Sequence, residues 1–361
     1  MEASLVSDQI NITSHKGIYS VFFDTQLLNK LKTFTNSETH FLVDSNVARL
    51  YPTQLQEILR HKNTVLIEAK ENNKSLENII PIFESLVANK VRRSHHLVAV
   101  GGGIIQDITC FIASTLLRGL PWRFIPTTLL SQADSCIGSK SSINLGSTKN
   151  ILGTYNPPNE IFICPSFIDT LVSSDIYSGI GEIIKVHAID GIQSFDALDH
   201  DYDRLLVNRD LLLAYTRSAL LIKKRFIEAD EFDQGIRNVF NYGHSFGHAI
   251  EAATSYKVPH GIAVTIGMDM ANRIANLRGL LSSSHYLRMH SLLKKNYSEF
   301  SRVQIPLDGL ISAITKDKKN TTNSLVLILP VGNNAEIQRK EVLPDEEFRS
   351  QCKLFLDEIS P

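Results

Sequence analysis

The chain has 361 residues, of which 43% are hydrophobic and 21% are charged, and its formal net charge is -1. This length suffices for two domains of ordinary size. The balanced charge lacks the basic excess of a nucleic-acid-binding protein. The N-terminus has no basic segment followed by an apolar one, and no apolar run reaches the length of a membrane span. We therefore expect a globular, cytoplasmic protein with neither nucleic acid nor membrane as a partner.

Short β-rich runs alternate with a helical pattern in the first half of the chain. The runs are 41–44, 64–68, 97–100, 122–126 and 160–164. Between the second and the third, residues 76–87 carry apolar side chains at helical spacing. This alternation predicts an α/β domain over residues 1–165, with a mostly parallel sheet and helices on its faces.

The pattern changes after about residue 165. Residues 211–229 and 262–281 are long and favour helix, and only residues 325–329 suggest a late strand. We expect residues 166–361 to form an all-helical domain apart from this late strand. Residues 155–159 contain consecutive prolines, which exclude regular helix, and are a candidate part of the hinge region.

The four cysteines are too scattered to suggest a disulfide framework or a thiolate metal site. They are Cys110, Cys136, Cys164 and Cys352, and no two of them form a CxxC pair. We expect reduced thiols.

A glycine turn follows the strand predicted at 97–100. Gly101–Gly103 would let backbone N–H groups approach a pyrophosphate at the start of the next helix. The GxGxxG fingerprint is incomplete, because Gln106 stands at its third glycine, so a plain tight turn is the alternative. Asp44 favours the nucleotide, since a carboxylate at the end of an earlier strand commonly binds ribose hydroxyls.

A second polar segment follows the strand predicted at 122–126. Its hydroxyls, carboxylate, amide and cations are those of Thr127, Thr128, Asp134, Lys140, Lys149 and Asn150. Such a set in a mostly apolar neighbourhood suggests an anionic ligand beside the cofactor. The alternative is a solvated loop with ordinary surface lysines.

Three histidines mark the second half. His244 and His248 are four residues apart and share a helix face, and His260 follows shortly after. With a carboxylate nearby, the group favours a divalent metal over three structural histidines. The segment is not HExxH, which argues against a zincin protease. Spacing alone leaves open whether His248 binds the metal or the substrate.

Glu182 and Lys185 also share a helix face, although a surface ion pair is the alternative there. Residues 223–225 are all basic, and for them the alternative is the solvated side of an amphipathic helix.

Together these motifs resemble the sugar phosphate cyclases, and most closely the 3-dehydroquinate synthases. The resemblance extends from Asp44 to the segment 317–319. The motifs in register are Gly101-Gly-Gly-x-x-x-Asp107, Pro126-Thr-Thr-Leu-Leu-Ser-Gln-x-Asp134-Ser, Lys149-Asn150, Gly181-Glu182-x-Ile-Lys185, Arg237, Asn241-x-Gly-His244-x-Phe-Gly-His248-Ala-Ile-Glu251 and His260-Gly261.

The resemblance implies a Rossmann-like NAD domain, a helical metal-binding domain and an active site in the cleft between them. The implied metal ligands are Glu182, His244 and His260, with His248 contacting the substrate phosphate. The positions that match nucleotide contacts are Asp44, Asn46, Glu71, Lys74, Gly103, Asp107, Thr127, Thr128, Lys140, Lys149, Phe167 and Thr170. The positions that match substrate contacts are Asp134, Lys140, Asn150, Lys185, Lys223, Arg237, Asn241, one of Lys318 and Lys319, and Arg118 from across a dimer interface. Two imidazoles and one carboxylate suit zinc and tolerate cobalt.

The implied reaction converts DAHP, a seven-carbon keto-acid phosphate, into 3-dehydroquinate and phosphate. It proceeds by transient oxidation of the C5 hydroxyl at NAD, elimination of phosphate, return of the hydride and intramolecular aldol closure. Lys223 and Arg237 favour this substrate, because a guanidinium can hold a carboxylate through two hydrogen bonds.

Several departures from the family pattern keep other readings open. They are Ser139, Ser141, Lys70, Gln106 and Ile262. One alternative is a specialised cyclase for sedoheptulose 7-phosphate or glucose 6-phosphate, similar to the 2-deoxy-scyllo-inosose synthases. Others are an NAD- and metal-dependent polyol dehydrogenase and a non-catalytic paralogue.

Overall fold

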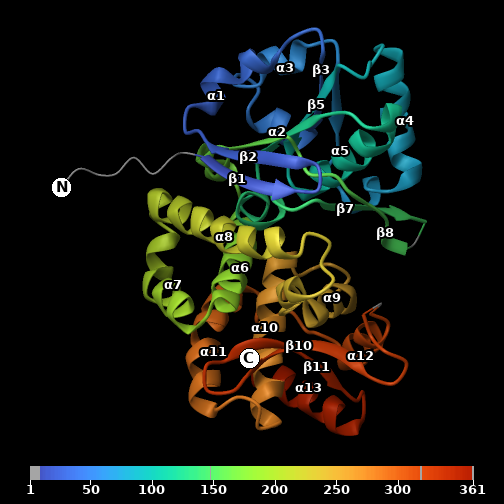
Figure 1. Ribbon diagram of the computed structural model, residues 1–361. Helices are drawn as coiled ribbons and strands as arrows, with labels where there is room; N and C mark the ends of the chain where they lie inside the picture. The colour runs from blue at the N-terminus through green and yellow to red at the C-terminus, as the bar shows by residue number, and fades with distance from the viewer. Residues whose placement is uncertain (1–8, 147, 318, 360–361) are drawn as a thin grey trace, which may run out of the picture. The chain divides into compact units, whose positions relative to one another are not determined.

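The computed structural model describes residues 9–146, 148–317 and 319–359. The chain forms two compact units (Figure 1). The first consists of Met1–Leu171 and Lys224–Phe232, and the second of Val172–Lys223 and Asp233–Pro361. The consecutive prolines at 157–158 lie within the first unit, and the chain first passes to the second after Leu171.

The first unit is built on a seven-stranded sheet in the order β1-β2-β9-β6-β5-β3-β4. Its strands are β1 (Gln9–Ser14), β2 (Gly17–Phe23), β3 (Thr39–Asp44), β4 (Thr64–Ile67), β5 (His96–Gly101), β6 (Trp122–Pro126) and β9 (Glu160–Ile163). Every neighbouring pair is parallel except β1 and β2. The expected parallel sheet is therefore confirmed. Parallel order brings the carboxyl ends of β3, β5 and β6 to one edge, where ligands bind in such sheets.

Helices connect these strands. They are α1 (Leu27–Lys30), α2 (Ser45–Leu50), α3 (Gln56–Arg60), α4 (Leu76–Ala88) and α5 (Gly103–Thr115). A separate antiparallel ribbon, β7 (Lys140–Leu145) and β8 (Thr148–Tyr155), was not expected from the sequence. Its strands mix polar and apolar residues without clean alternation.

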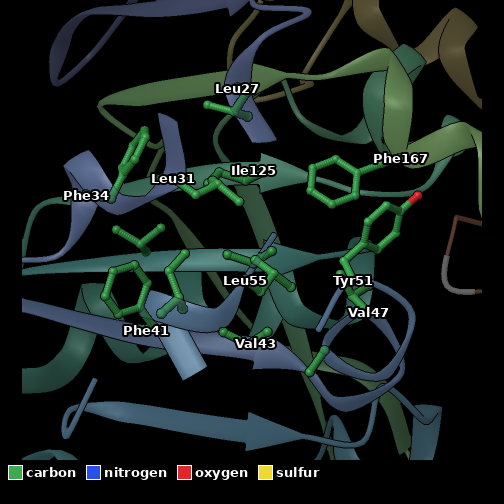
Figure 2. Close-up of a cluster of buried hydrophobic side chains, with 14 of the residues drawn as sticks. Leu27, Leu31, Phe34, Phe41, Val43, Val47, Tyr51, Leu55, Ile125 and Phe167 are labelled. Atoms are coloured by element: carbon green, nitrogen blue, oxygen red, sulfur yellow. The ribbon is translucent and has the colours of Figure 1, made fainter. Parts of the chain in front are cut away.

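A hydrophobic core packs between the sheet and its helices (Figure 2). Phe41, Val43 and Val98 contribute from strands that are buried on both faces, which explains their nearly continuous apolar sequences. Phe167 closes one end with its ring 5.0 Å from that of Tyr51, whose hydroxyl points out of the cluster. That hydroxyl donates to the carbonyl of Ser166 at 2.9 Å, so the polar atom is satisfied where the core ends.

The second unit is helical with one added hairpin. Its elements are α6 (Ser173–Asp190), α7 (Ile192–Leu205), most of α8 (Arg209–Ala229), α9 (His244–Ala253), α10 (His260–Leu277), α11 (Ser283–Tyr297), α12 (Leu307–Thr315), β10 (Leu325–Val331), β11 (Glu336–Val342) and α13 (Glu346–Ile359). Helix α10 is buried along nearly its whole length. A helix that is apolar on all sides belongs at the centre of a bundle, and the other helices supply its cover.

The helical domain predicted from the sequence is therefore confirmed, and β10 matches the late strand. Its partner β11, of sequence EIQRKEV, escaped notice because charged residues dominate it. The four cysteines are free and buried. No helix in the described ranges is long and apolar enough to cross a bilayer.

Candidate active site

In the second unit, three helices bring Glu182, His244 and His260 to one point. Glu182 projects from α6, His244 from the first position of α9 and His260 from the first position of α10. Glu182 Oε1 lies 3.8 Å from His244 Nε2 and 3.5 Å from His260 Nε2. The structure thus brings together the three residues that the family resemblance implied as metal ligands.

His248 lies beside this group. The ligand atoms of His244, His248 and His260 all lie within 4.8 Å of one another. The cluster therefore offers three imidazoles and a carboxylate, which is one protein ligand more than an open catalytic zinc site uses. His248 is the most solvent-accessible of the three histidines, although the surrounding protein still restricts the hydration of its ring, and this position suits a ligand that enters from solvent.

Burial keeps most of these imidazoles neutral. It lowers the pKa of His244 well below its usual value and that of His248 to about 4, and neighbouring positive charges act in the same direction. For His260 burial opposes protonation, but the hydrogen bond to Glu251 and the charges of Glu251 and Glu182 outweigh it and raise the pKa. Neutral imidazoles beside a buried carboxylate form a donor set that a divalent cation requires.

Two further contacts orient the rings. Glu251 Oε2 lies 3.2 Å from His260 Nδ1, and the carbonyl of Tyr242 lies 3.3 Å from His244 Nδ1. Each contact engages Nδ1 and leaves Nε2 to face Glu182. Such partners fix the tautomer and raise the basicity of the opposite nitrogen. Glu251 was part of the sequence motif, but its orienting role becomes visible only from the geometry.

Glycines allow the ligand-bearing helices to approach closely. A Cβ on Gly261 would overlap the carbonyl oxygen of Ser178 on α6, and a Cβ on Gly267 would overlap that of Gly243, the residue before α9. Thus α10 touches backbone on both sides of the cluster. A larger residue at Gly261 would push α10 away from α6, which holds Glu182, and one at Gly267 would push it away from α9, which holds His244.

Other polar and cationic residues that the family resemblance implied belong to the same unit. Lys185 forms an ion pair with Glu182 and is nearly fully buried, so the surface-pair reading is wrong. Lys223 and Arg237 are each 7% exposed, which excludes the solvated-face reading for Lys223. Lys319 donates to Asn241 Oδ1 at 2.7 Å. Lys318 lies outside the described residues.

The first unit carries the predicted glycine turn at the carboxyl end of β5. Gly102 is the residue before α5, and Gly103 is its first residue. A Cβ on Gly101 would clash with Ile105, and a Cβ on Gly102 would lie 3.0 Å from Thr128 Cγ2. The turn is therefore tight, and its backbone lies against the end of β6. The start of a thirteen-residue helix beside small residues suits a pyrophosphate.

Asp44 lies next to this turn. Its carboxylate accepts from the backbone of Asn46 at 2.8 Å and caps α2. Burial raises its pKa, although hydrogen bonds from the backbone of Asn46 and Val47 act against the rise. A Cβ on Gly101 would lie 3.2 Å from Asp44 Cβ, so the carboxylate and the turn share the sheet edge expected for a nucleotide.

A hydrogen-bonded network joins four of the predicted residues. Lys74 Nζ donates to Asp107 Oδ2 at 3.0 Å and to Asn150 Oδ1 at 2.9 Å, and it lies 3.7 Å from Glu71 Oε1. Burial raises the pKa of Asp107, and the charge of Lys74 partly offsets this. Asn150 adopts φ 51, a conformation that asparagine tolerates better than most residues. The family resemblance implied nucleotide contacts for Lys74 and Asp107 and a substrate contact for Asn150, and the structure joins all three by hydrogen bonds.

Asn144 completes this network and was missed. Its amide nitrogen donates to Glu71 Oε1 at 3.0 Å, and its amide oxygen accepts from the backbone N–H of Asn150 at 2.9 Å. The sequence offered no signal for it, because its place depends on the β7–β8 pairing.

Gln106, which replaces a glycine of the nucleotide fingerprint, also has a structural role. Its side chain donates to the carbonyl of Ser135 at 2.7 Å and accepts from the Ser135 hydroxyl at 2.8 Å. Ser135 ends a short π-helix, Ser131–Ser135, which also carries Asp134. Such helices are frequent at functional sites. The Thr128 hydroxyl donates to the Ser131 hydroxyl at 2.8 Å and so contacts the start of this helix. Thr127 is buried.

The remaining predicted site residues of the first unit differ in how accessible their side chains are to a ligand. Phe167 is 1% exposed in the core, so any nucleotide contact there would involve its backbone. The Thr170 hydroxyl lies 2.9 Å from that of Tyr51. Lys140 is exposed, and Lys149 Nζ lies 4.0 Å from Glu71 Oε1. Arg118 lies on a loop where it and Leu117 both have positive φ, at 67 and 53.

Two family models match adjacent segments of the chain. The 3-dehydroquinate synthase N-terminal model matches residues 64–178, and the C-terminal model matches residues 179–320. A 3-dehydroquinate synthase of Clostridium tetani is 34% identical over 348 residues, which cover 90% of this chain and 91% of that protein. One from Dictyoglomus turgidum is 34% identical over 342 residues, which cover 93% and 94%.

Solved structures show the same fold. A 2-epi-5-epi-valiolone synthase from Streptomyces hygroscopicus with NAD+ and Zn2+ bound is 27% identical, with a TM-score of 0.80 over 94% of this chain and 97% of that chain. A 2-deoxy-scyllo-inosose synthase complexed with carbaglucose-6-phosphate, NAD+ and Co2+ has a TM-score of 0.81 at 20% identity, over 97% and 99%. The glycerol dehydrogenase of Schizosaccharomyces pombe aligns less well, with a TM-score of 0.59 at 15% identity over 94% and 89%.

Proposed function

The chain belongs to the 3-dehydroquinate synthase family of carbon–oxygen lyases, and we propose that it converts DAHP into 3-dehydroquinate and phosphate. The observation that carries this proposal is the match of both family models to consecutive segments of the chain, residues 64–178 and 179–320. Relatives that share a third of their residues over nine-tenths of this chain bear the same name.

Two buried cations support the choice of substrate. Lys223 and Arg237 are the residues that would bind the carboxylate of DAHP, which neither sedoheptulose 7-phosphate nor glucose 6-phosphate carries. Both side chains are only 7% exposed, so solvent would screen their attraction to a substrate carboxylate only weakly.

We propose NAD and a divalent metal as cofactors. Both are present in the valiolone synthase structure, which is 27% identical. Glu182, His244 and His260 would hold the metal, for which zinc is the first choice and cobalt the second. Asp44, Asn46, Glu71, Lys74, Gly103, Asp107, Thr127, Thr128, Lys140, Lys149, Phe167 and Thr170 would hold NAD. When bound, NAD supplies a reversible hydride acceptor and the metal supplies a Lewis acid for the C5 hydroxyl.

The chain's own residues bind and orient the substrate. Lys223 and Arg237 would fix the carboxylate end, and His248 with Asn241 and Lys319 would bind the phosphate. The hydrogen bond from Lys319 to Asn241 holds both side chains in place before the substrate arrives, which lowers the entropic cost of binding. Asp134, Asn150, Lys140 and Lys185 are the other proposed contacts.

Arg118 is proposed to reach the phosphate of a neighbouring subunit in a homodimer. The consecutive positive φ angles of Leu117 and Arg118 support a functional role for this loop. Left-handed conformations cost roughly 1–2 kcal/mol per non-glycine residue, and such strain collects at ligand-binding segments.

The competing function is a specialised cyclase, which the similarity to the valiolone synthase favours. Phosphate release by NAD- and zinc-loaded protein decides between the two. DAHP, sedoheptulose 7-phosphate and glucose 6-phosphate are compared side by side, with the product mass recorded. Release from DAHP with 3-dehydroquinate formed and no net NADH supports the proposal. Release only from a neutral sugar phosphate contradicts it, and net NADH from simple alcohols would indicate a dehydrogenase.

The role of Arg237 has its own test. Arg237→Ala should weaken the binding of DAHP far more than that of NAD, because it removes a partner of the carboxylate. Equal loss for both ligands would remove Arg237 from the substrate pocket.

A further inference from the structure

The carboxylate of Glu231 joins two distant parts of the first unit. Glu231 lies two residues beyond the end of α8, in the segment 224–232 that belongs to this unit. Its Oε1 accepts from the Ser139 hydroxyl at 2.5 Å and lies 2.8 Å from His15 Nδ1, and its Oε2 accepts from the backbone N–H of His15 at 2.7 Å. Ser139 directly precedes β7, and His15 lies in the turn between β1 and β2. Three segments far apart in the sequence thus meet at one carboxylate.

These contacts are largely shielded from water. The Glu231 side chain is 11% exposed, and Ser139 is 1% exposed. Burial acts to raise the pKa of Glu231, but the hydrogen bonds from Ser139 and His15 outweigh it and lower the pKa. The carboxylate is therefore ionised at neutral pH. Hydrogen bonds to an ionised acceptor are stronger than those between neutral groups, so the Ser139 hydroxyl is held in one direction.

The backbone around Ser139 is held as well. The N–H of Gly138 donates to the Tyr19 hydroxyl at 2.9 Å, and the carbonyl of Ser139 accepts from the N–H of Asn156 at 2.7 Å. With its side chain bound to Glu231, Ser139 is therefore fixed at three points. The next residue is Lys140, the first residue of β7 and a proposed contact of NAD.

A second contact holds the residue opposite Lys140. In the β7–β8 ribbon, Lys140 pairs with Tyr155. The Tyr155 hydroxyl donates to the carbonyl of Phe232 at 3.3 Å, and the two rings lie 4.9 Å apart in an edge-to-face arrangement. The residue before Lys140 and the residue across from it are thus both attached to the segment 231–232. This segment restricts the backbone of Lys140 from two sides.

We propose that the Ser139–Glu231 hydrogen bond positions Lys140 for binding NAD, which makes Ser139 and Glu231 positioning residues. The proposal rests on the proposed function in one respect, namely that Lys140 contacts NAD. Ser139 is one of the departures from the family pattern, so this contact adds to the machinery that the pattern describes. A lysine whose backbone is ordered in advance loses less conformational freedom when the cofactor binds.

Calorimetric titration with NAD tests this role in the full-length, zinc-loaded protein from which NAD has been removed. Ser139→Ala removes the hydroxyl and leaves Glu231 its contacts with His15, so the variant should fold. Its Kd for NAD should rise about five-fold, because ordering the loop then opposes binding. Ser37→Ala is the matched control, since it removes an exposed hydroxyl from a turn of the same unit and should leave the Kd unchanged.

A double-mutant cycle with Lys140→Met shows whether Ser139 acts through Lys140. Lys140→Met alone should raise the Kd for NAD about ten-fold, since it removes a charged contact. In that background, Ser139→Ala should change the Kd by less than about two-fold, because the residue that it positions no longer binds. Losses that multiply would show that Ser139 supports the first unit in another way and would overturn the proposal. An unchanged Kd in either single variant would also overturn it.

Glu231→Gln tests the other partner of the hydrogen bond. The amide keeps the size of the side chain, but one of its ends is a donor and cannot accept from Ser139 or His15. It should raise the Kd for NAD at least as much as Ser139→Ala and should lose this effect in the Lys140→Met background. An effect of Glu231→Gln that persists in that background would overturn the proposal.

Phosphate release from DAHP separates this proposal from the proposed function. Coupling between Ser139 and Lys140 in a protein that does not act on DAHP would contradict only the proposed substrate. A protein that releases phosphate from DAHP but shows no such coupling would contradict only the positioning role.

Discussion

The two polar clusters of this protein are held in place in different ways. In the first unit, Lys74 lies within hydrogen-bonding reach of Asp107 and Asn150, so each charge is compensated by neighbouring side chains. In the second unit, Glu182 Oε1 lies 3.8 Å from His244 Nε2 and 3.5 Å from His260 Nε2. There the positions are set by helices packed backbone to backbone through Gly261 and Gly267.

The difference indicates which cluster depends on a bound group. The network around Lys74 is complete without a ligand, and its loss should weaken the folded protein itself. The cluster around Glu182 places a carboxylate at 1% exposure among imidazoles, with Lys185 as its ion-pair partner. Because Lys185 already pairs with this carboxylate, a bound divalent cation would add its own binding free energy, which stabilises the folded protein only when metal is present. The following substitutions test that contrast.

The largest effect is expected for Glu182→Gln. The amide keeps the size of the side chain but removes the negative charge from the donor set, so metal affinity should collapse. Activity should fall about 10³-fold or more, which corresponds to about 4 kcal/mol of transition-state stabilisation. Bound metal is measured by mass spectrometry, and phosphate release is measured with DAHP.

The same variant should behave differently once metal is removed. In chelated protein, Glu182→Gln should cost less stability than it does with metal present, because only the ion pair with Lys185 is lost and the stabilisation by bound metal is absent from both proteins. An equal loss with and without metal would show that Glu182 is chiefly structural and would end the contrast between the clusters.

Gly261→Ala is expected to have the next largest effect. The added Cβ would overlap the carbonyl of Ser178 and push α10 away from α6. We expect a loss of about 3 kcal/mol in the free energy of unfolding, which is typical of overpacking at a close contact. Denaturant unfolding measures this loss, and Gly279→Ala serves as a control that meets no neighbouring atom, although its positive φ adds some strain. Equal losses in both variants would show that backbone strain, and not the helix contact, is responsible.

The sequence predicted the frame of both clusters but not how they are assembled. Apolar spacing gave the strands around Phe41 and Val98 and the long helix of His260, because burial imposes those patterns. It could not show that Glu182 meets His260, since the contact depends on how α6 crosses α10; that pairing came only from the family resemblance. Asn144 escaped for a similar reason, because its amide is placed by the pairing of β7 with β8.

A buried histidine of α6 makes the second unit sensitive to pH. Burial lowers the pKa of His187, on α6, to about 4. The unfolded chain binds a proton below about pH 6.5 and the folded chain does so only near pH 4. His187 should therefore add no pH dependence well above pH 6.5 and should lower the stability by about 2 kcal/mol as the pH drops to 4.5.

Urea unfolding at several pH values measures this fall. His187→Gln should remove about 2 kcal/mol of the fall in that window, although the lowered pKa values of His244 and His248 still contribute to it. His200→Gln, which removes an exposed histidine on α7, should leave the curve unchanged. Identical curves for wild type and His187→Gln would assign the fall to other groups.

The smallest effect is expected for Lys74→Met, which tests the first unit. The substitution keeps most of the apolar stem but removes the donor to Asp107 and Asn150. Asp107 is then left partly buried without its main charge partner, which should cost about 1–2 kcal/mol of stability. The loss should be the same with and without metal, in contrast to Glu182→Gln, because the network is satisfied by protein groups alone. A matched variant, Lys70→Met, removes an exposed lysine that pairs with Glu68 and should change stability little. Lys74→Met could instead leave the stability of the unliganded protein unchanged and abolish NAD binding. The residues of the network would then be positioned for a ligand and not stabilised by one another, as in the cluster around Glu182.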